Sequence, residues 1–159
     1  MRKTYRITLE NNLVFEFHFN SEHFYHLLGL EKLHDVNQLR ILSKRNVFRQ
    51  LLNGKLKSTT ISSSVDYPKI ENRVKNFEKI LNLLNINKTK IIIDFDPSKV
   101  SDTKLHNTKF ILYNREKCGY CHLTIGYIKY YYPETFFFEY SKRYISEQNL
   151  LEIINIEIL

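Results

Sequence analysis

The chain has 159 residues, of which 43% are hydrophobic and 26% charged, so it can form one ordinary core and is unlike a disordered tail. Lysine and arginine outnumber aspartate and glutamate by 24 to 17, which favours a polyanionic partner such as nucleic acid, although basic proteins without such a partner also exist. No apolar run approaches the ~20 residues of a membrane span, no signal peptide is visible, and two cysteines cannot form a disulfide scaffold, so we expect one cytoplasmic domain over residues 1–159 without membrane contact.

Two short apolar runs, 5–9 and 13–19, open the chain on either side of Asn11 and Asn12. In the second run aromatic residues alternate with polar ones, which is the period of a half-buried strand. Because asparagine tolerates the positive φ of a tight turn, the two runs predict an N-terminal β-hairpin.

Helices are predicted to follow the hairpin. Asn20 or Ser21 is expected to cap the first of them, and Gly29 to end it in the left-handed conformation. A second helix is predicted over 46–53. The apolar spacing over 68–84, with a proline in the first turn, predicts the strongest helix of the chain.

The remaining segments complete an α+β fold. The stretch 58–64 is rich in serine and threonine and predicts a loop. After Asn87 the chain turns into short runs of isoleucine, phenylalanine and tyrosine that polar links separate, which predicts an antiparallel sheet. These runs are 90–95, 109–113, 121–132, 135–140 and 151–158. Strands and helices do not alternate, so we expect a hairpin and helices followed by an antiparallel sheet.

Cys118, Cys121 and His122 have the spacing of a c-type haem attachment site. That chemistry needs export, for which the sequence shows no signal. Zinc binding at the two cysteines would need two further ligands, for which His34 and His106 would have to converge in space. Zinc stays open as a less favoured alternative to ordinary thiols, and we expect no metal and no cofactor.

Histidines, basic residues and hydroxyls are what metal-free RNA cleavage requires. A base takes the proton of the 2′-OH, an acid protonates the leaving 5′-oxygen, and cations stabilise the phosphorane. His26 and His122 are the candidate acid and base because imidazole titrates near neutrality, with a structural role as the alternative for each. The candidate phosphate contacts are Lys129, Lys142, Arg143, Thr135 and Tyr132.

Tyrosines surround a lysine in the run 127–132. If that run is one strand, Tyr127, Lys129 and Tyr131 share a face, and exposed rings there would stack unpaired bases. We therefore add Tyr127 to Tyr132 and the basic residues as predicted nucleic-acid contacts. Cross-strand packing of the rings is the alternative.

Two groups of segments resemble a known family. The first group contains His-Leu-Leu-Gly-Leu from His26, and the second contains Pro-Glu-Thr-Phe-Phe from Pro133. Over about residues 15–158 the chain resembles the fourth subfamily of phage-associated barnase/EndoU/colicin/RelE-like (BECR) nucleases. The resemblance implies a small α+β domain that cuts RNA without metal, with His26, His122 and Thr135 in its site.

These observations favour a metal-independent endoribonuclease that cleaves by 2′-OH transesterification, with a toxin or conflict role in a phage or mobile element. The alternative is a non-catalytic phage module that binds nucleic acid or protein, for example an inhibitor of a host defence complex. RNA is the expected partner in the first case, and a neutralising or target protein would fit either.

Overall fold

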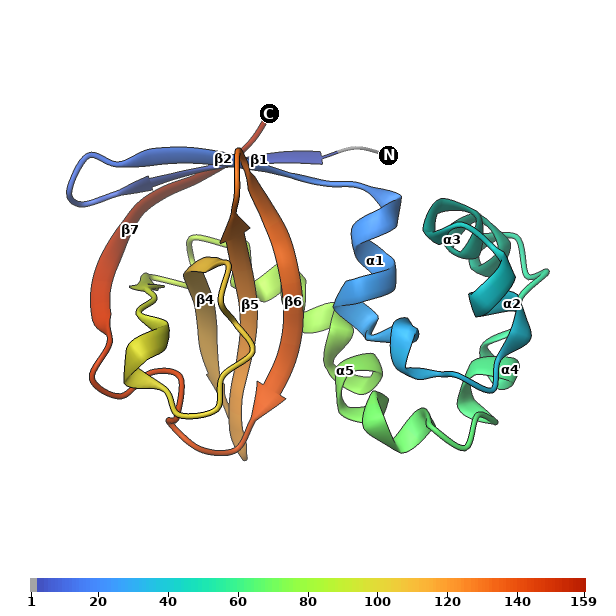
Figure 1. The fold of residues 1–159 in the computed structure, drawn as a ribbon. Helices are drawn as coiled ribbons and strands as arrows, with labels where there is room; N and C mark the ends of the chain where they lie inside the picture. Colours follow the sequence, from blue (N-terminus) through green and yellow to red (C-terminus); the bar gives the residue numbers. More distant parts are fainter. Residues whose placement is uncertain (1–2) are drawn as a thin grey trace.

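The computed structural model describes residues 3–159, in which a barrel of strands lies beside a group of helices (Figure 1). The strands follow one another around the barrel in the order β1-β2-β6-β5-β4-β3-β7. Their bounds are β1 Lys3–Leu9, β2 Val14–Phe19, β3 Ile91–Asp94, β4 Thr108–Glu116, β5 Gly119–Tyr127, β6 Tyr131–Glu139 and β7 Asn149–Ile158. The mixed content of helix and strand agrees with the predicted α+β class.

The sheet differs from the predicted one in how it closes. The β1–β2 hairpin forms as predicted, but it is part of the same sheet as the C-terminal strands and is not separate from it. β1 pairs antiparallel with β7, whereas β2 pairs parallel with β6 through Phe17 and Tyr131. A purely antiparallel sheet is therefore not what the structure contains. The closing contacts join strands that are distant in sequence, so no local pattern indicated them.

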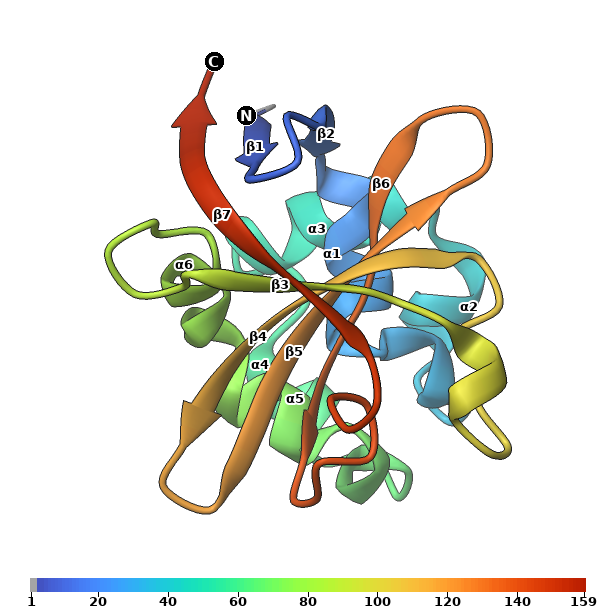
Figure 2. The ribbon, with the colours of Figure 1, turned by 90° about the vertical axis from the view of Figure 1, so that its left-hand side faces the viewer.

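Most helices gather beside β6 in Figure 1 and behind the barrel in Figure 2, whereas the last one, α6, packs against β4 and β5. The helices are α1 Ser21–Leu28, α2 Asn37–Ile41, α3 Lys44–Leu52, α4 Ser58–Ser62, α5 Glu71–Asn76 and α6 Ile80–Leu83. The caps of α1 agree with the prediction. The Asn20 side chain accepts hydrogen bonds from the backbone N–H groups of Glu22 and His23, and Gly29 ends the helix at φ 76°.

Two of the predicted segments were wrong. The segment 58–64, predicted as a loop, contains α4 because Ile61 turns inward and is buried. The single helix predicted over 68–84 is broken into α5 and α6 by a 3-10 turn, Phe77–Lys79. Ile70 belongs to the core of the helical group, whereas Ile80 belongs to the core shared with the barrel, so the segment bends to fill both.

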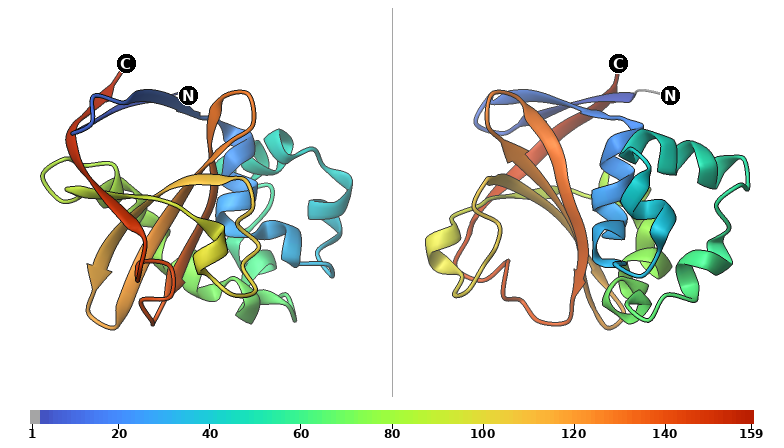
Figure 3. Two further views of the ribbon diagram at one scale, coloured as in Figure 1. Left: turned by 60° about the vertical axis from the view of Figure 1, so that its left-hand side comes forward. Right: turned by 45° about the vertical axis from the view of Figure 1, so that its right-hand side comes forward.

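The run 121–132 is two strands and not one. A turn at residues 128–130 separates β5 from β6, and Tyr127 pairs across it with Tyr131. Lys129 lies in the turn, so it does not share a strand face with the two tyrosines. The turn lies at the same end of the molecule as both termini (Figure 3). It contains no glycine, proline or asparagine, and so it lacked the usual turn signal.

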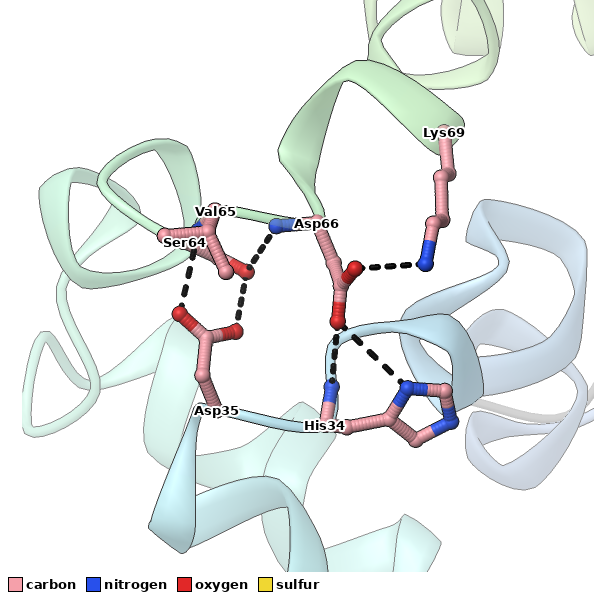
Figure 4. Close-up of polar contacts among 6 residues, drawn as sticks. All are labelled: His34, Asp35, Ser64, Val65, Asp66 and Lys69. Carbon is pink, nitrogen blue, oxygen red and sulfur yellow. Dashed lines mark hydrogen bonds and ion pairs between the residues drawn. The ribbon is translucent and has the colours of Figure 1, made fainter.

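Two aspartates join separate turns of the helical group (Figure 4). Asp35 accepts hydrogen bonds from the Ser64 hydroxyl and, at 3.0 Å, from the Val65 N–H. Asp66 accepts from the His34 N–H at 3.3 Å and pairs with Lys69 at 2.5 Å. These contacts fix the segment after α1 against the segment that leads into α5.

Replacing Asp35 with asparagine is expected to lower the urea midpoint of unfolding at neutral pH. The bonds from Ser64 and Val65 hold the pKa of Asp35 below its usual value, so the carboxylate stabilises the fold above its unfolded pKa. That contribution is lost as the pH falls through the lower, folded pKa. Urea unfolding of both proteins should therefore show a difference that narrows below about pH 4. A difference that does not change with pH would contradict this role.

Candidate active site

The seam between α1 and β6 brings together side chains from three separate elements. β6 pairs with β2 only at Tyr131, so most of that edge of β6 is free to pack against α1 (Figure 1). α5 lies at the lower end of the seam in the same view and contacts both. Polar side chains of α1, α5 and β6 therefore meet at the surface of the molecule.

Arg73 of α5 connects two of the predicted site residues. Its Nη1 donates to the Thr135 hydroxyl at 3.1 Å and to the His26 backbone carbonyl at 3.5 Å. Burial lowers the pKa of Arg73, but a guanidinium remains charged at any physiological pH. Gly29 leaves room for it, because a Cβ at that position would lie 3.3 Å from Nη1. The structure therefore places His26 and Thr135 beside one cation that sequence reasoning missed.

The His26 ring lies between a carboxylate and an ammonium group. Its Nδ1 is 3.7 Å from Glu31 Oε2, and its Nε2 is 2.5 Å from Lys44 Nζ. Because an ammonium group only donates, Nε2 is the unprotonated nitrogen and Nδ1 carries the proton that faces Glu31. Burial raises the pKa of Glu31, but the His26 hydrogen bond and Arg73 outweigh it and hold that pKa below its usual value. The ring is 43% exposed and is held in one tautomer.

A cleft of about 330 Å³ opens beside Thr135, and its lining includes two carboxylates, Asp102 and Glu139. Arg73, Lys104 and Tyr144 line it with Thr135. Burial lowers the pKa of Lys32, and the nearby positive charges of Arg73 and Lys104 lower it further. Arg73, which donates to the Thr135 hydroxyl, is therefore the group in this cleft best placed to contact an anion beside that hydroxyl.

His122 is inside the molecule and does not reach this cleft. It is fully buried, its ring stacks on Phe137 at 4.7 Å, and neither ring nitrogen has a hydrogen-bonding partner within residues 3–159. Burial lowers the pKa of His122 to about 4, against an opposing effect of the Tyr120 backbone. The near-neutral pKa on which the predicted acid–base role of His122 depended is therefore not found, because Phe137 and Tyr144 pack against the buried ring.

Replacing His122 with phenylalanine is expected to make the protein more resistant to acid. The unfolded chain binds a proton at about the usual pKa of 6.5, whereas the folded chain binds one only near pH 4. Stability should therefore fall by about 3 kcal/mol between neutral pH and about pH 4 in the natural protein. Urea unfolding should show this loss, and it should be smaller by that amount in His122→Phe. The exposed control, His34→Phe, should lose as much stability as the natural protein. An equal loss in the natural protein and in His122→Phe would contradict the burial of a neutral ring.

The predicted nucleic-acid contacts lie at different places along the seam. Tyr132 and Lys129 line one cleft at the β5–β6 turn, together with His23 of α1. Tyr127 packs against Tyr131 at 4.7 Å, and Tyr131 faces away from its strand neighbour Tyr132, so Tyr127 is outside that cleft.

The other two predicted cations lie beyond the far end of β6. Arg143 donates to the Ser101 carbonyl and lies over the Tyr144 ring at 5.3 Å, while Lys142 is exposed beside it in the chain. Because Tyr144 lines the cleft at Thr135, Arg143 is close to that cleft.

The cysteines do not form part of the site. Cys118 is exposed and Cys121 is buried, and both are free thiols. Burial raises the pKa of Cys121 to about 11, so that thiol stays protonated at neutral pH. Within residues 3–159 no three histidine, cysteine or acidic side chains are placed to hold a metal ion, so the zinc alternative finds no ligand set there. In the same residues, no helix has the length and apolarity needed to cross a membrane.

The sequence contains one signal that Arg73 is a functional residue. Position 73 lies three residues after Ile70 and four before Phe77, so it falls on the apolar side of the predicted helix. A charged residue on that side needs a buried partner or a ligand. Lys32, Lys104 and Glu31 carried no comparable signal, because the folded chain alone brings them to the cleft.

Comparison with known families gives one match. The family model PBECR4, described as phage-Barnase-EndoU-ColicinE5/D-RelE like nuclease4, matches residues 1–157. Searches of curated proteins and of solved structures found no significant match.

Proposed function

The chain belongs to the PBECR4 family of phage BECR-like nucleases, and on that basis we propose that it is an endoribonuclease that cleaves RNA without a metal ion. The observation that carries the proposal is the position of Arg73, whose guanidinium lies between the His26 backbone and the Thr135 hydroxyl at a surface cleft that Lys104 also lines. A phosphodiester is the anion that this nuclease family leads us to expect there.

His26 is the proposed base. In the free protein the Lys44 ammonium group donates a hydrogen bond to His26 Nε2. When RNA binds, this group moves to the RNA backbone, and Nε2 accepts the 2′-OH proton. Glu31 stabilises the imidazolium that forms. The 2′-oxygen bonds to phosphorus, the bond from phosphorus to the 5′-oxygen breaks, and that oxygen takes a proton from water. The products are a 2′,3′-cyclic phosphate and a 5′-hydroxyl.

Arg73 and Thr135 act on the phosphate in this scheme. The guanidinium and the hydroxyl donate to its non-bridging oxygens, where negative charge grows as the phosphorane forms. Lys129 and Tyr132 bind the strand on one side, and Lys142 and Arg143 stay predicted contacts on the other. The role in conflict between phage and host, the cytoplasmic location and a neutralising or target protein also stay predictions.

The test is cleavage in the presence of a chelator. The purified protein is incubated with total RNA in excess EDTA. The His26→Ala variant, prepared in parallel in the same way, controls for contaminating nucleases. We expect discrete fragments from the natural protein alone. Cleavage that starts only when a divalent metal is restored would overturn the metal-independent mechanism.

The burial of His122 favours a second candidate, a non-catalytic module that binds RNA. One of the two predicted imidazoles is withdrawn from the surface, which leaves the site with one candidate base and no second imidazole as acid. Such a module would bind RNA with an affinity that falls steeply as salt rises, and it would form no products. Products that form in EDTA would exclude it.

A further inference from the structure

The turn between β5 and β6 carries a second cleft, at the other end of the seam from Arg73. It measures about 420 Å³ and is lined by hairpin residues, Tyr130 and Tyr132 among them, and by His23 of α1. Tyr132 and Thr135 are three residues apart on β6, a span of about 10 Å along a strand. One RNA strand can therefore contact both clefts.

Tyr132 is held in place by the strand beneath it. Gly126 is its partner in the β5–β6 register, and a Cβ on Gly126 would lie 2.6 Å from the ring Cζ and 2.7 Å from the hydroxyl oxygen. The absent side chain lets the ring lie directly on the backbone of β5. The Tyr130 ring, which is 71% exposed, meets it edge-on at 6.4 Å and 70°. The two rings form a fixed aromatic corner.

His23 adds an imidazole ring to this corner. The Asn20 N–H donates to His23 Nδ1 at 3.3 Å, so Nδ1 is unprotonated and the ring proton is on Nε2. Burial lowers the pKa of His23, which keeps the ring neutral at neutral pH. A hydrogen bond to the His18 backbone acts against this effect of burial and holds the ring in place. The cleft therefore offers an aromatic surface, the His23 imidazole and the Lys129 ammonium group.

We propose that this cleft is a subsite for one unpaired nucleobase, and that the protein therefore acts on single-stranded RNA. The base stacks on Tyr132, the His23 ring contributes one hydrogen bond at its edge, and Lys129 contacts the adjacent phosphate. In a duplex both faces of each base are covered by its neighbours, so a duplex cannot use the cleft. This inference rests on the proposed function and adds the form of the substrate.

Binding of an RNA that cannot be cleaved tests the subsite. A fluorescein-labelled ten-nucleotide RNA with 2′-O-methyl groups is titrated with the natural protein, alone and annealed to its complement, and anisotropy is recorded. We expect the single strand to bind at least about 10-fold more tightly than the duplex. Tyr132→Leu should weaken single-strand binding by about 5- to 100-fold, whereas Tyr132→Phe should retain it. Tyr140→Leu, at an exposed tyrosine outside the cleft, is the matched control and should bind like the natural protein.

The outcomes separate this inference from the proposed function. Equal affinity for single strand and duplex, no binding of either, or unchanged binding by Tyr132→Leu would each overturn the subsite. Cleavage of natural RNA in EDTA would still support the ribonuclease in all three cases. If Tyr132→Leu loses its folded circular dichroism spectrum, His23→Ala replaces it, with an expected loss of about 5-fold for one hydrogen bond.

Discussion

Replacement of His26 with alanine is expected to lower the rate of RNA cleavage by about 10²- to 10⁴-fold, the usual contribution of a general base. The ring is 43% exposed and its contacts are with two surface side chains, Glu31 and Lys44. The backbone carbonyl that receives the Arg73 bond is present in the variant as well. The melting temperature should therefore change little. The measurement is the initial rate of cleavage of a labelled RNA in EDTA, beside a thermal melt.

His34→Ala is the matched control for this result. His34 is also a surface histidine paired with a carboxylate, but its partner is Asp66 (Figure 4), and His34 does not line the cleft at Thr135. This variant should cleave at the rate of the natural protein. A His26→Ala protein that is folded and fully active would remove His26 from the mechanism.

The second large effect is expected at Arg73. Arg73→Ala should lower kcat/KM by about 10²- to 10³-fold, because it removes the donor that faces the growing charge on the phosphate. Arg73→Lys should recover only part of this activity, since a single ammonium group cannot contact Thr135 and two phosphate oxygens in the same planar geometry. The measurement is kcat/KM for one defined RNA in each variant.

The control for Arg73 lies on the same helix. Lys75 pairs with Glu71 on the exposed side of α5 at 2.7 Å, so Lys75→Ala removes a positive charge without touching the cleft. We expect its cleavage rate to stay within about 2-fold of the natural protein at moderate salt. If Lys75→Ala and Arg73→Ala lose activity equally, overall charge and not the position of Arg73 is what matters.

The sequence pattern correctly predicted those features of the fold that depend on residues close together in the chain. The Asn20 cap, the Gly29 end of α1 and the β1–β2 hairpin depend on residues within a few positions of one another, and all three were confirmed. The break between α5 and α6 has a distant cause, because Ile70 and Ile80 enter different cores. The barrel closes through Phe17 and Tyr131, which are more than a hundred residues apart, so the sequence pattern indicated a sheet but not its closure.

The same distinction applies to the candidate site. His26 and Thr135 were predicted from the chemistry of their side chains and again from the family resemblance, and Arg73 contacts the backbone of the first and the hydroxyl of the second. The resemblance carried no information about the burial of His122, which depends on Phe137 and on the loop that carries Tyr144. An imidazole in a strand has the same sequence pattern whether it faces solvent or a core. Packing alone distinguished the two histidines.

The chemistry at the 3′ ends of the RNA fragments tests the central claim most directly. RNA is incubated with the natural protein in excess EDTA, and the products are separated before and after treatment with acid, which opens a cyclic phosphate. We predict 2′,3′-cyclic phosphate ends from the natural protein and none from His26→Ala, because attack by the 2′-OH leaves that group. Fragments with 3′-hydroxyl ends would show attack by water and would contradict the proposed mechanism.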